Sequence, residues 1–370
     1  MRQDGSGFAG ATGPARPQTG TESASAAAAE EGAVLVAEDL RVVFPAAEGH
    51  ISPVRGVGFR VGHGEAIGVV GESGSGKSLT ALAIARLLEE PARTTAARLD
   101  FDGTSLLLTS VAQQRTLLGT SFAMVFQDPL TSFNPTRRIG HQLAEVAREH
   151  QGMRRRPALT RAVDRLRAVG IAEPERRASA FPHELSGGMR QRAMIGLGLM
   201  GTPRLLVADE PTTALDVTVQ RQVLDLLADV RAQDSVALLL ISHDIAVVEQ
   251  ACDRVLVMYA GRIVEELPAA GLRTRARHPY TRALVDAVPD MTTDRSEPLA
   301  VIPGQPVDPA DVPAGCAFAA RCPRADRQCT AREPALSGTG TDTGKVACWH
   351  PFDARDPSPH DRATATSGDH

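Results

Sequence analysis

The sequence predicts an α/β fold with an inserted helical subdomain and a small cysteine-containing extension toward the C-terminus. Three observations support this prediction. Short apolar segments of strand length end at a glycine or at acidic residues. Longer segments with helical periodicity lie between them, an alternation typical of a parallel sheet covered by helices. Near the C-terminus the periodicity fades, while proline, glycine and cysteine become frequent.

We expect the 370 residues to divide into four parts. Residues 1–32 are rich in small residues and lack the apolar region of a signal peptide, which predicts a disordered extension. Residues 33–270 are expected to form the main domain, with the helical subdomain at about 128–195, where charged segments show helical periodicity. Residues 271–350 are expected to form the C-terminal extension, and residues 351–370 a disordered tail.

The composition narrows the class of function. A formal net charge of −4 gives no basic surface for nucleic acid, so no nucleic-acid partner is expected. Hydrophobic residues make up 42% of the chain. However, no uninterrupted apolar run reaches the roughly 18 residues that a membrane-spanning helix needs. We therefore expect a soluble protein or one bound peripherally to a membrane.

The first chemical motif, GESGSGKS at residues 71–78, follows an apolar strand-like segment and precedes a helical one. In this setting backbone N–H groups and the helix N-terminus can bind phosphate oxygens. Lys77 supplies a positive charge for the β and γ phosphates, and Ser78 a hydroxyl for Mg²⁺. The motif predicts a nucleoside triphosphate site made by Gly71, Ser73, Gly74, Ser75, Gly76, Lys77, Ser78 and Leu79.

A pair of acids narrows the chemistry. Residues 205–210 read LLVADE, an apolar strand that ends in Asp209 and Glu210. Asp209 can hold Mg²⁺ through water, and Glu210 can orient or deprotonate an attacking water. Two adjacent acids can also simply end a strand, but the glycine loop upstream favours the catalytic interpretation.

The sequence LSGGM at residues 185–189 resembles the signature motif of the ABC ATPase family. Ser186 and the amides of Gly187 and Gly188 can form an anion-binding nest at a helix start. The resemblance implies a P-loop, RecA-like core that binds ATP and Mg²⁺. It also implies a dimer, in which this nest faces the γ phosphate held by the P-loop of a second subunit.

Other positions acquire roles through the same resemblance. Gln127 in VFQDP matches the glutamine that touches Mg²⁺ and the attacking water, and Asp216 in TALD belongs to the loop that crosses the dimer interface. His243 in ISHD matches the switch histidine at the γ phosphate, although alone it would more often be an ordinary loop histidine. Phe44 is the candidate for stacking on adenine. The resemblance thus implies ATP hydrolysis, with catalytic residues Glu210, His243 and Gln127 and magnesium ligands Ser78, Gln127 and Asp209.

Longer stretches narrow the resemblance further. FQDPLTSFNP, ADEPTTALDVTVQ, MYAGRIVE and HPYTRALVDAVP resemble the dipeptide and oligopeptide importer ATPases, and the likeness covers about residues 33–350. It implies a paralogous second ATPase subunit, two transmembrane permease subunits, an external substrate-binding protein and a peripheral position at the cytoplasmic face of the membrane. Nickel importers share much of this sequence. A non-transport ABC ATPase and a redox-responsive switch are further alternatives.

Four cysteines lie in the extension: Cys316, Cys322, Cys329 and Cys348. Structural zinc sites usually contain two cysteines separated by two to four residues, and this spacing does not occur here. Four thiolates can instead hold a [4Fe–4S] cluster, which tolerates varied spacing. Some peptide-importer ATPases carry such a cluster at this location, so the resemblance implies one. Zinc and unligated thiols remain the alternatives.

Overall fold

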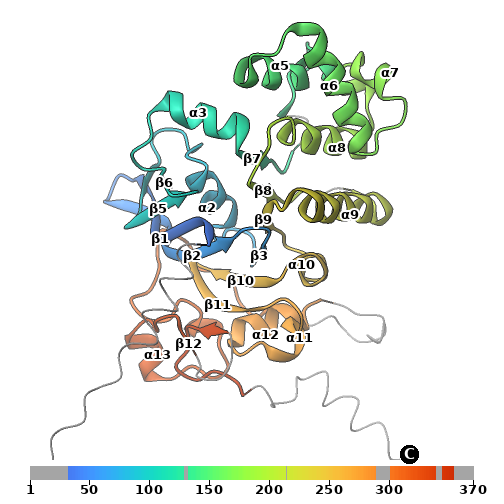
Figure 1. Cartoon of the computed structure of the whole chain (residues 1–370). Coiled ribbons are helices and arrows are strands. Elements are labelled where there is room, and N and C mark those ends of the chain that lie inside the picture. Colours follow the sequence, from blue (N-terminus) through green and yellow to red (C-terminus); the bar gives the residue numbers. More distant parts are fainter. Residues whose placement is uncertain (1–31, 129–131, 214, 289–300, 339–343, 354–370) are drawn as a thin grey trace, which may run out of the picture.

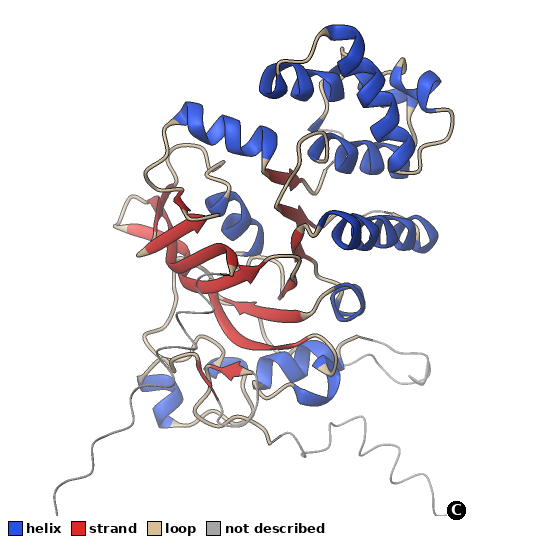
Figure 2. Ribbon diagram, in the orientation of Figure 1, coloured by secondary structure: helices blue, strands red, loops and turns tan. Residues whose placement is uncertain are grey.

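The computed structural model describes residues 32–128, 132–213, 215–288, 301–338 and 344–353. The expected disordered segments at the two ends lie almost entirely outside these ranges. Strands occupy the middle of the molecule, with a group of helices on one side and the C-terminal extension on the opposite side (Figures 1 and 2). The predicted α/β architecture with inserted helices is confirmed.

One sheet is antiparallel and lies at the N-terminal end of the chain. Its order is β2-β1-β5-β6, with β4 also paired to β1. The two long strands alternate buried and exposed positions over much of their length, as expected of a sheet with one face on the core. The strands are β1 (Ala33–Pro45), β2 (His50–Gly62), β4 (Arg93–Thr95), β5 (Arg98–Phe101) and β6 (Thr104–Ser105).

The second sheet is mixed, with the order β12-β13-β11-β10-β3-β9-β8-β7. Neighbouring strands from β10 to β7 are parallel. On the other side of β10, β11, β13 and β12 extend the sheet with antiparallel pairs. Every residue of β3, β8 and β9 is buried, because helices and the other sheet cover both faces. The strands are β3 (Ala66–Val70), β7 (Phe122–Val125), β8 (Leu205–Asp209), β9 (Ala237–Ile241), β10 (Arg254–Tyr259), β11 (Arg262–Pro268), β12 (Ser337–Gly338) and β13 (Lys345–Val346).

Helices connect the parallel strands. Between β7 and β8 along the chain, α5 to α8 form the helical group at the top of Figure 1, and their apolar faces share one core with α9 and the sheet. No helix in the described ranges is long and apolar enough to cross a membrane. The helices of the main domain are α2 (Lys77–Ile84), α3 (Val111–Thr120), α5 (Ile139–Gln151), α6 (Arg155–Ala168), α7 (Pro174–Ala178), η1 (Pro182–Glu184), α8 (Gly187–Gly198), α9 (Val217–Asp234) and α10 (Ile245–Ala251).

The C-terminal extension packs directly on the mixed sheet. Tyr280 and Phe318 from the extension share a core with Val257 and Tyr259 of β10. Their rings pack closely, with centroids of Tyr259 and Tyr280 4.6 Å apart. The extension therefore continues the core of the main domain. Its helices are α11 (Leu272–Arg275), α12 (Pro279–Asp286), η2 (Ala319–Arg321) and α13 (Arg327–Ala331).

Candidate functional site

The glycine loop joins β3 to α2, as the motif predicts. Gly76 has φ 98°, and a Cβ there would lie 2.6 Å from the carbonyl oxygen of Pro53. A Cβ on Gly71 would lie 2.2 Å from the carbonyl oxygen of Met258. Only glycine lets the loop approach these backbones so closely, and a tight loop of this kind before a helix start can direct N–H groups at an anion.

Lys77 lies inside this loop. Its Nζ donates to the carbonyl oxygens of Gly71, at 2.8 Å, and Glu72, at 2.9 Å. Burial lowers the pKa of Lys77, whereas the nearby carboxylates of Glu210, Asp209 and Glu72 favour its charged form. The ammonium group is thus held where a phosphate bound by the loop would meet it.

Two of the three residues predicted to hold Mg²⁺, Ser78 and Asp209, meet across 131 positions of sequence. Ser78 Oγ donates to Asp209 Oδ1 at 2.9 Å. Burial raises the pKa of Asp209, and this hydrogen bond opposes that rise. A hydroxyl and a carboxylate are the hard oxygen donors that Mg²⁺ prefers, so this pair fits the ion.

Three side chains converge on the carboxylate of Glu210. Its Oε2 accepts from Gln127 Nε2 at 3.0 Å and from Thr213 Oγ1 at 2.8 Å, and it lies 3.3 Å from His243 Nδ1. Gln127 follows β7, Glu210 follows β8 and His243 follows β9, so the carboxyl ends of neighbouring parallel strands bring the three together. Reasoning from sequence missed the hydrogen bond from Thr213, whose only signal was its place three residues after Glu210.

Glu210 itself has an unusual backbone. Its φ is 47°, in the left-handed region that non-glycine residues rarely adopt. The N–H of Glu210 donates to the carbonyl of Ile241 in β9 at 2.9 Å, which fixes this conformation. Such strain costs about 1 kcal/mol or more and is concentrated at functional sites.

The signature residues stand at helix starts apart from the glycine loop. Ser186 caps α8 by accepting from the N–H of Met189 at 3.3 Å, and Asp216 caps α9 by accepting from Val219 at 2.9 Å. The two helix starts are close, since a Cβ on Gly188 would lie 2.5 Å from Val219 Cγ1. In Figure 1, α8 lies with the helical group, away from α2. The fold thus leaves Ser186, Gly187 and Gly188 separate from the loop of the same chain.

Comparisons with known proteins agree with this arrangement. A family model described as "ABC transporter" matches residues 54–213, and one described as "Oligopeptide/dipeptide transporter, C-terminal region" matches residues 264–329. A probable peptide ABC transporter ATP-binding protein, y4tR of Sinorhizobium fredii, is 46% identical over 317 residues, which is 85% of this chain and 94% of the relative. The chain belongs to the ABC transporter ATP-binding proteins.

Other relatives of this ABC ATPase are also similar over most of their length. The dipeptide transport ATP-binding protein DppD of Escherichia coli is 43% identical, covering 87% of this chain and 98% of the relative. The oligopeptide transport ATP-binding protein OppD of Bacillus subtilis is 41% identical, with coverage of 86% and 89%. A solved dimeric structure of the ATP-binding cassette MJ0796, bound to ADP and Pi, has a TM-score of 0.58 and 23% identity, covering 64% of this chain and 99% of that one. The predicted fold, the family resemblance and the assignment as an ATPase are confirmed.

Two residues predicted to contact nucleotide are half-buried in the core of the ABC ATPase. Phe44 of β1 lies opposite Ile51 of β2, and both Phe44 and Leu79 of α2 pack against the core shared by the two sheets. The role of Phe44 in stacking on adenine and the contact of Leu79 with nucleotide remain predictions.

The four cysteines of the extension line one cavity, together with His278, Phe318 and Trp349. Burial raises the pKa of all four thiols, that of Cys348 to about 11, so the free thiols are protonated near neutral pH. In the described part of the chain, the group of three possible metal-ligand residues whose atoms lie within 4.8 Å of one another is Asp326, Cys329 and His350. The fold therefore gathers the four predicted cysteines around one cavity, but it does not bring three of their sulfurs into such a group.

Asp326 joins two of the cysteine-bearing segments. Its Oδ1 accepts from the N–H of Cys329 at 3.0 Å, and its Oδ2 lies 2.9 Å from His350 Nε2. These bonds and the histidine ring lower the pKa of Asp326 to about 2. An ionised aspartate thus connects the helix that carries Cys329 to the segment just after Cys348.

Proposed function

We propose that this ABC ATPase drives the uptake of dipeptides or oligopeptides across the cytoplasmic membrane. The match of residues 264–329 to the C-terminal region of oligopeptide/dipeptide transporters supports this cargo, because that region lies outside the catalytic core. The names of the relatives point the same way. The convergence of Gln127, Thr213 and His243 on Glu210 is the observation that supports active hydrolysis rather than ATP binding alone.

In the proposed mechanism the glycine loop and Lys77 bind the phosphates of ATP, and Phe44 stacks on adenine. Ser78, Gln127 and Asp209 would hold Mg²⁺, which would supply positive charge to the phosphates. Glu210 orients the attacking water and accepts its proton, while His243 lies at the γ phosphate. The carboxylate of Glu210 already accepts a hydrogen bond from Gln127. Movement of the loop that carries Gln127 would therefore change the position of the catalytic base.

The proposed assembly contains a second, paralogous ATPase subunit, two transmembrane permeases and an external substrate-binding protein, with this chain at the cytoplasmic face of the membrane. Each ATP would lie between the glycine loop of one chain and Ser186, Gly187 and Gly188 of the other, with Asp216 at the interface. The separation of α8 from α2 within one chain supports this composite site.

We propose further that the four cysteines hold a [4Fe–4S] cluster. All four cysteines line one cavity, so one bound group could reach all of their sulfurs. Four thiolates are a ligand set that holds a [4Fe–4S] cluster. Protein purified without oxygen should be brown, absorb broadly at roughly 400 nm and contain iron; colourless, iron-free protein would refute the cluster.

The decisive experiment for the transport function is isolation of the membrane complex through this chain. Mass spectrometry is expected to identify two permeases and a second ATPase. Hydrolysis by the reconstituted complex should rise when peptides are added with the binding protein, and nickel ions are the matched control. Stimulation by nickel alone would overturn the peptide assignment, and a complex without permeases would overturn transport itself.

A further inference from the structure

The C-terminal extension forms hydrogen bonds with one residue of the glycine loop, Glu72. The N–H of Glu72 donates to Tyr280 Oη at 2.7 Å. Its carboxylate forms a two-point ion pair with Arg321, at 2.8 and 3.0 Å. The carbonyl of Glu72 accepts from Lys77 Nζ and from the N–H of Ser75. All the polar groups of this residue are therefore bonded, two of them by the extension.

Arg321 is fixed by its own surroundings. Its side chain is 4% exposed, Nε donates to the carbonyl of Pro303 at 2.7 Å, and the guanidinium lies over the rings of Tyr259 and Phe318. The hydrogen bonds to Glu72 raise the already high pKa of Arg321 further. The extension thus delivers a rigid, permanent positive charge to the loop.

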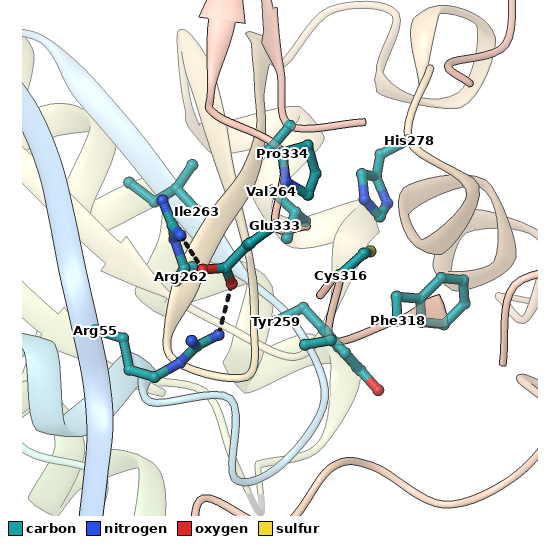
Figure 3. Close-up of a pocket in the computed structure, with 12 residues that line it drawn as sticks. Arg55, Tyr259, Arg262, Ile263, Val264, His278, Cys316, Phe318, Glu333 and Pro334 are labelled. Carbon is teal, nitrogen blue, oxygen red and sulfur yellow. Dashed lines mark hydrogen bonds and ion pairs between the residues drawn. The ribbon is translucent and has the colours of Figure 1, made fainter. Parts of the chain in front are cut away.

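A second connection lies at the other end of the segment 321–333. Glu333 pairs with Arg55 of β2 at 3.0 Å and with Arg262 of β11, as the dashed lines in Figure 3 show. Arg55 Nε donates to the carbonyl of Ala260, and the next N–H, of Gly261, donates to the carbonyl of Ser75 in the glycine loop. The segment that contains Cys322 and Cys329 is therefore attached at both ends to the surroundings of the loop.

The negative charge of Glu72 makes its ion pair with Arg321 relevant to phosphate binding by the loop. A carboxylate in a phosphate-binding loop repels the phosphates, and its field already acts on the charge of Lys77. The Glu72 side chain is half-buried, at 21% exposed, and a carboxylate with little access to water that loses its partner keeps this unfavourable charge. Arg321 compensates this charge and fixes the position of the carboxylate through two hydrogen bonds.

We propose that Arg321 is a positioning residue of the ATP site, which neutralises Glu72 and holds the glycine loop in its binding shape. The nucleotide affinity of the main domain then depends on the extension. The proposal rests on confirmed ATP binding and is independent of the cargo and of what the cysteines bind.

The test is a set of four full-length proteins: wild type, Arg321→Met, Glu72→Gln and the double variant. Equilibrium titration with a fluorescent ATP analogue and Mg²⁺ measures Kd, and steady-state assays separate KM from kcat. Arg321→Met is expected to weaken binding about fivefold or more, because the carboxylate of Glu72 is left uncompensated. Glu72→Gln alone should bind at least as tightly as wild type, and the double variant should recover the affinity lost in Arg321→Met.

Two controls separate this role from general stability. Arg332→Met removes another cation of the extension, which lies over the ring of Trp349, and should leave Kd unchanged. Tyr280→Phe keeps the ring and removes the acceptor of the Glu72 N–H, so binding should weaken about two- to tenfold even if Arg321→Met folds poorly. An unchanged Kd in both Arg321→Met and Tyr280→Phe, or a double variant as weak as Arg321→Met, would overturn the proposal.

Discussion

At the scale of single residues, the site is organised around Glu210. Its strained backbone directs the carboxylate toward Gln127, Thr213 and His243, while the adjacent Asp209 points to Ser78. Two neighbouring acids of the same chemistry thus have separate hydrogen-bond partners. This division of partners matches the separate roles proposed for them, water activation for Glu210 and metal binding for Asp209.

Replacing Glu210 with Gln tests the role of the base. The amide keeps the size and hydrogen-bonding reach of the side chain but cannot accept a proton, so kcat should fall about 10²- to 10⁴-fold. The Kd for ATP should stay near the wild-type value. Phosphate release and equilibrium titration measure the two quantities, and hydrolysis at the wild-type rate would refute the assignment.

Replacing Lys77 with Ala should instead raise the Kd for ATP. The variant loses the ammonium group that lies inside the glycine loop, and with it charge-assisted hydrogen bonds to phosphate. We expect ATP binding to weaken by about 1.5–3 kcal/mol, which is more than tenfold in Kd. Calorimetric titration checks this, and Lys345→Ala, which removes an exposed ammonium group on β13, is the matched control.

At the scale of elements, the ends of parallel strands and the starts of helices position the residues of the candidate site. The ends of β3, β7, β8 and β9 place the loop, Gln127, Glu210 and His243 at one edge of the sheet. Helices α8 and α9 begin at Ser186 and Asp216, whose side chains cap the first turns. A capping residue that also serves a partner's nucleotide has two measurable roles, stability and catalysis.

Ser186→Ala separates these two roles. Loss of a helix cap should lower the free energy of unfolding by about 1 kcal/mol. Ser110→Ala is the control, because Ser110 caps α3 in the same way but takes no part in the proposed site. Urea unfolding should show similar losses for both variants, whereas ATP hydrolysis by the assembled complex should fall only for Ser186→Ala. Equal activity of the two variants would contradict a role of Ser186 at the nucleotide.

At the scale of the whole molecule, the chain carries two groups of residues proposed to bind nucleotide, and the extension contacts the first of them. The glycine loop lies against the extension through Glu72, whereas α8, the helix that Ser186 caps, lies with the helical group on the side of the strands opposite the extension. In the proposed assembly, each closed site therefore takes its two parts from two chains. The extension belongs to the core of the molecule, since Tyr280 and Phe318 pack on β10.

The composite arrangement predicts how variants combine in the isolated complex. Lys77→Ala should remove the site that uses the glycine loop of this chain, and Ser186→Arg the site that uses its signature residues. Each single variant should trap one nucleotide per complex, and the double variant none. Counting nucleotides trapped with a phosphate analogue tests this, and a double variant that behaves like either single one would show that both residues serve the same site.

Local patterns in the sequence were enough to predict the α/β fold, the glycine loop and the acidic pair. Phosphate binding by Gly71 to Ser78 depends on a few consecutive residues between a strand and a helix, so its signal is local. The approach of Gln127 and His243 to Glu210 was implied by family resemblance, and the structure places them in hydrogen-bonding range. Their chemical roles stay predictions.

Only the tertiary structure decided which distant groups meet. The bond between Arg321 and Glu72 joins residues 249 positions apart, and no motif in the sequence predicts that the two meet. The spacing of Cys316, Cys322, Cys329 and Cys348 likewise did not require a common cavity. Such contacts depend on how the extension packs against β10, which is set by many apolar side chains together. The sequence alone therefore determined the chemistry of the nucleotide loop, while tertiary packing determined which distant residues contact it.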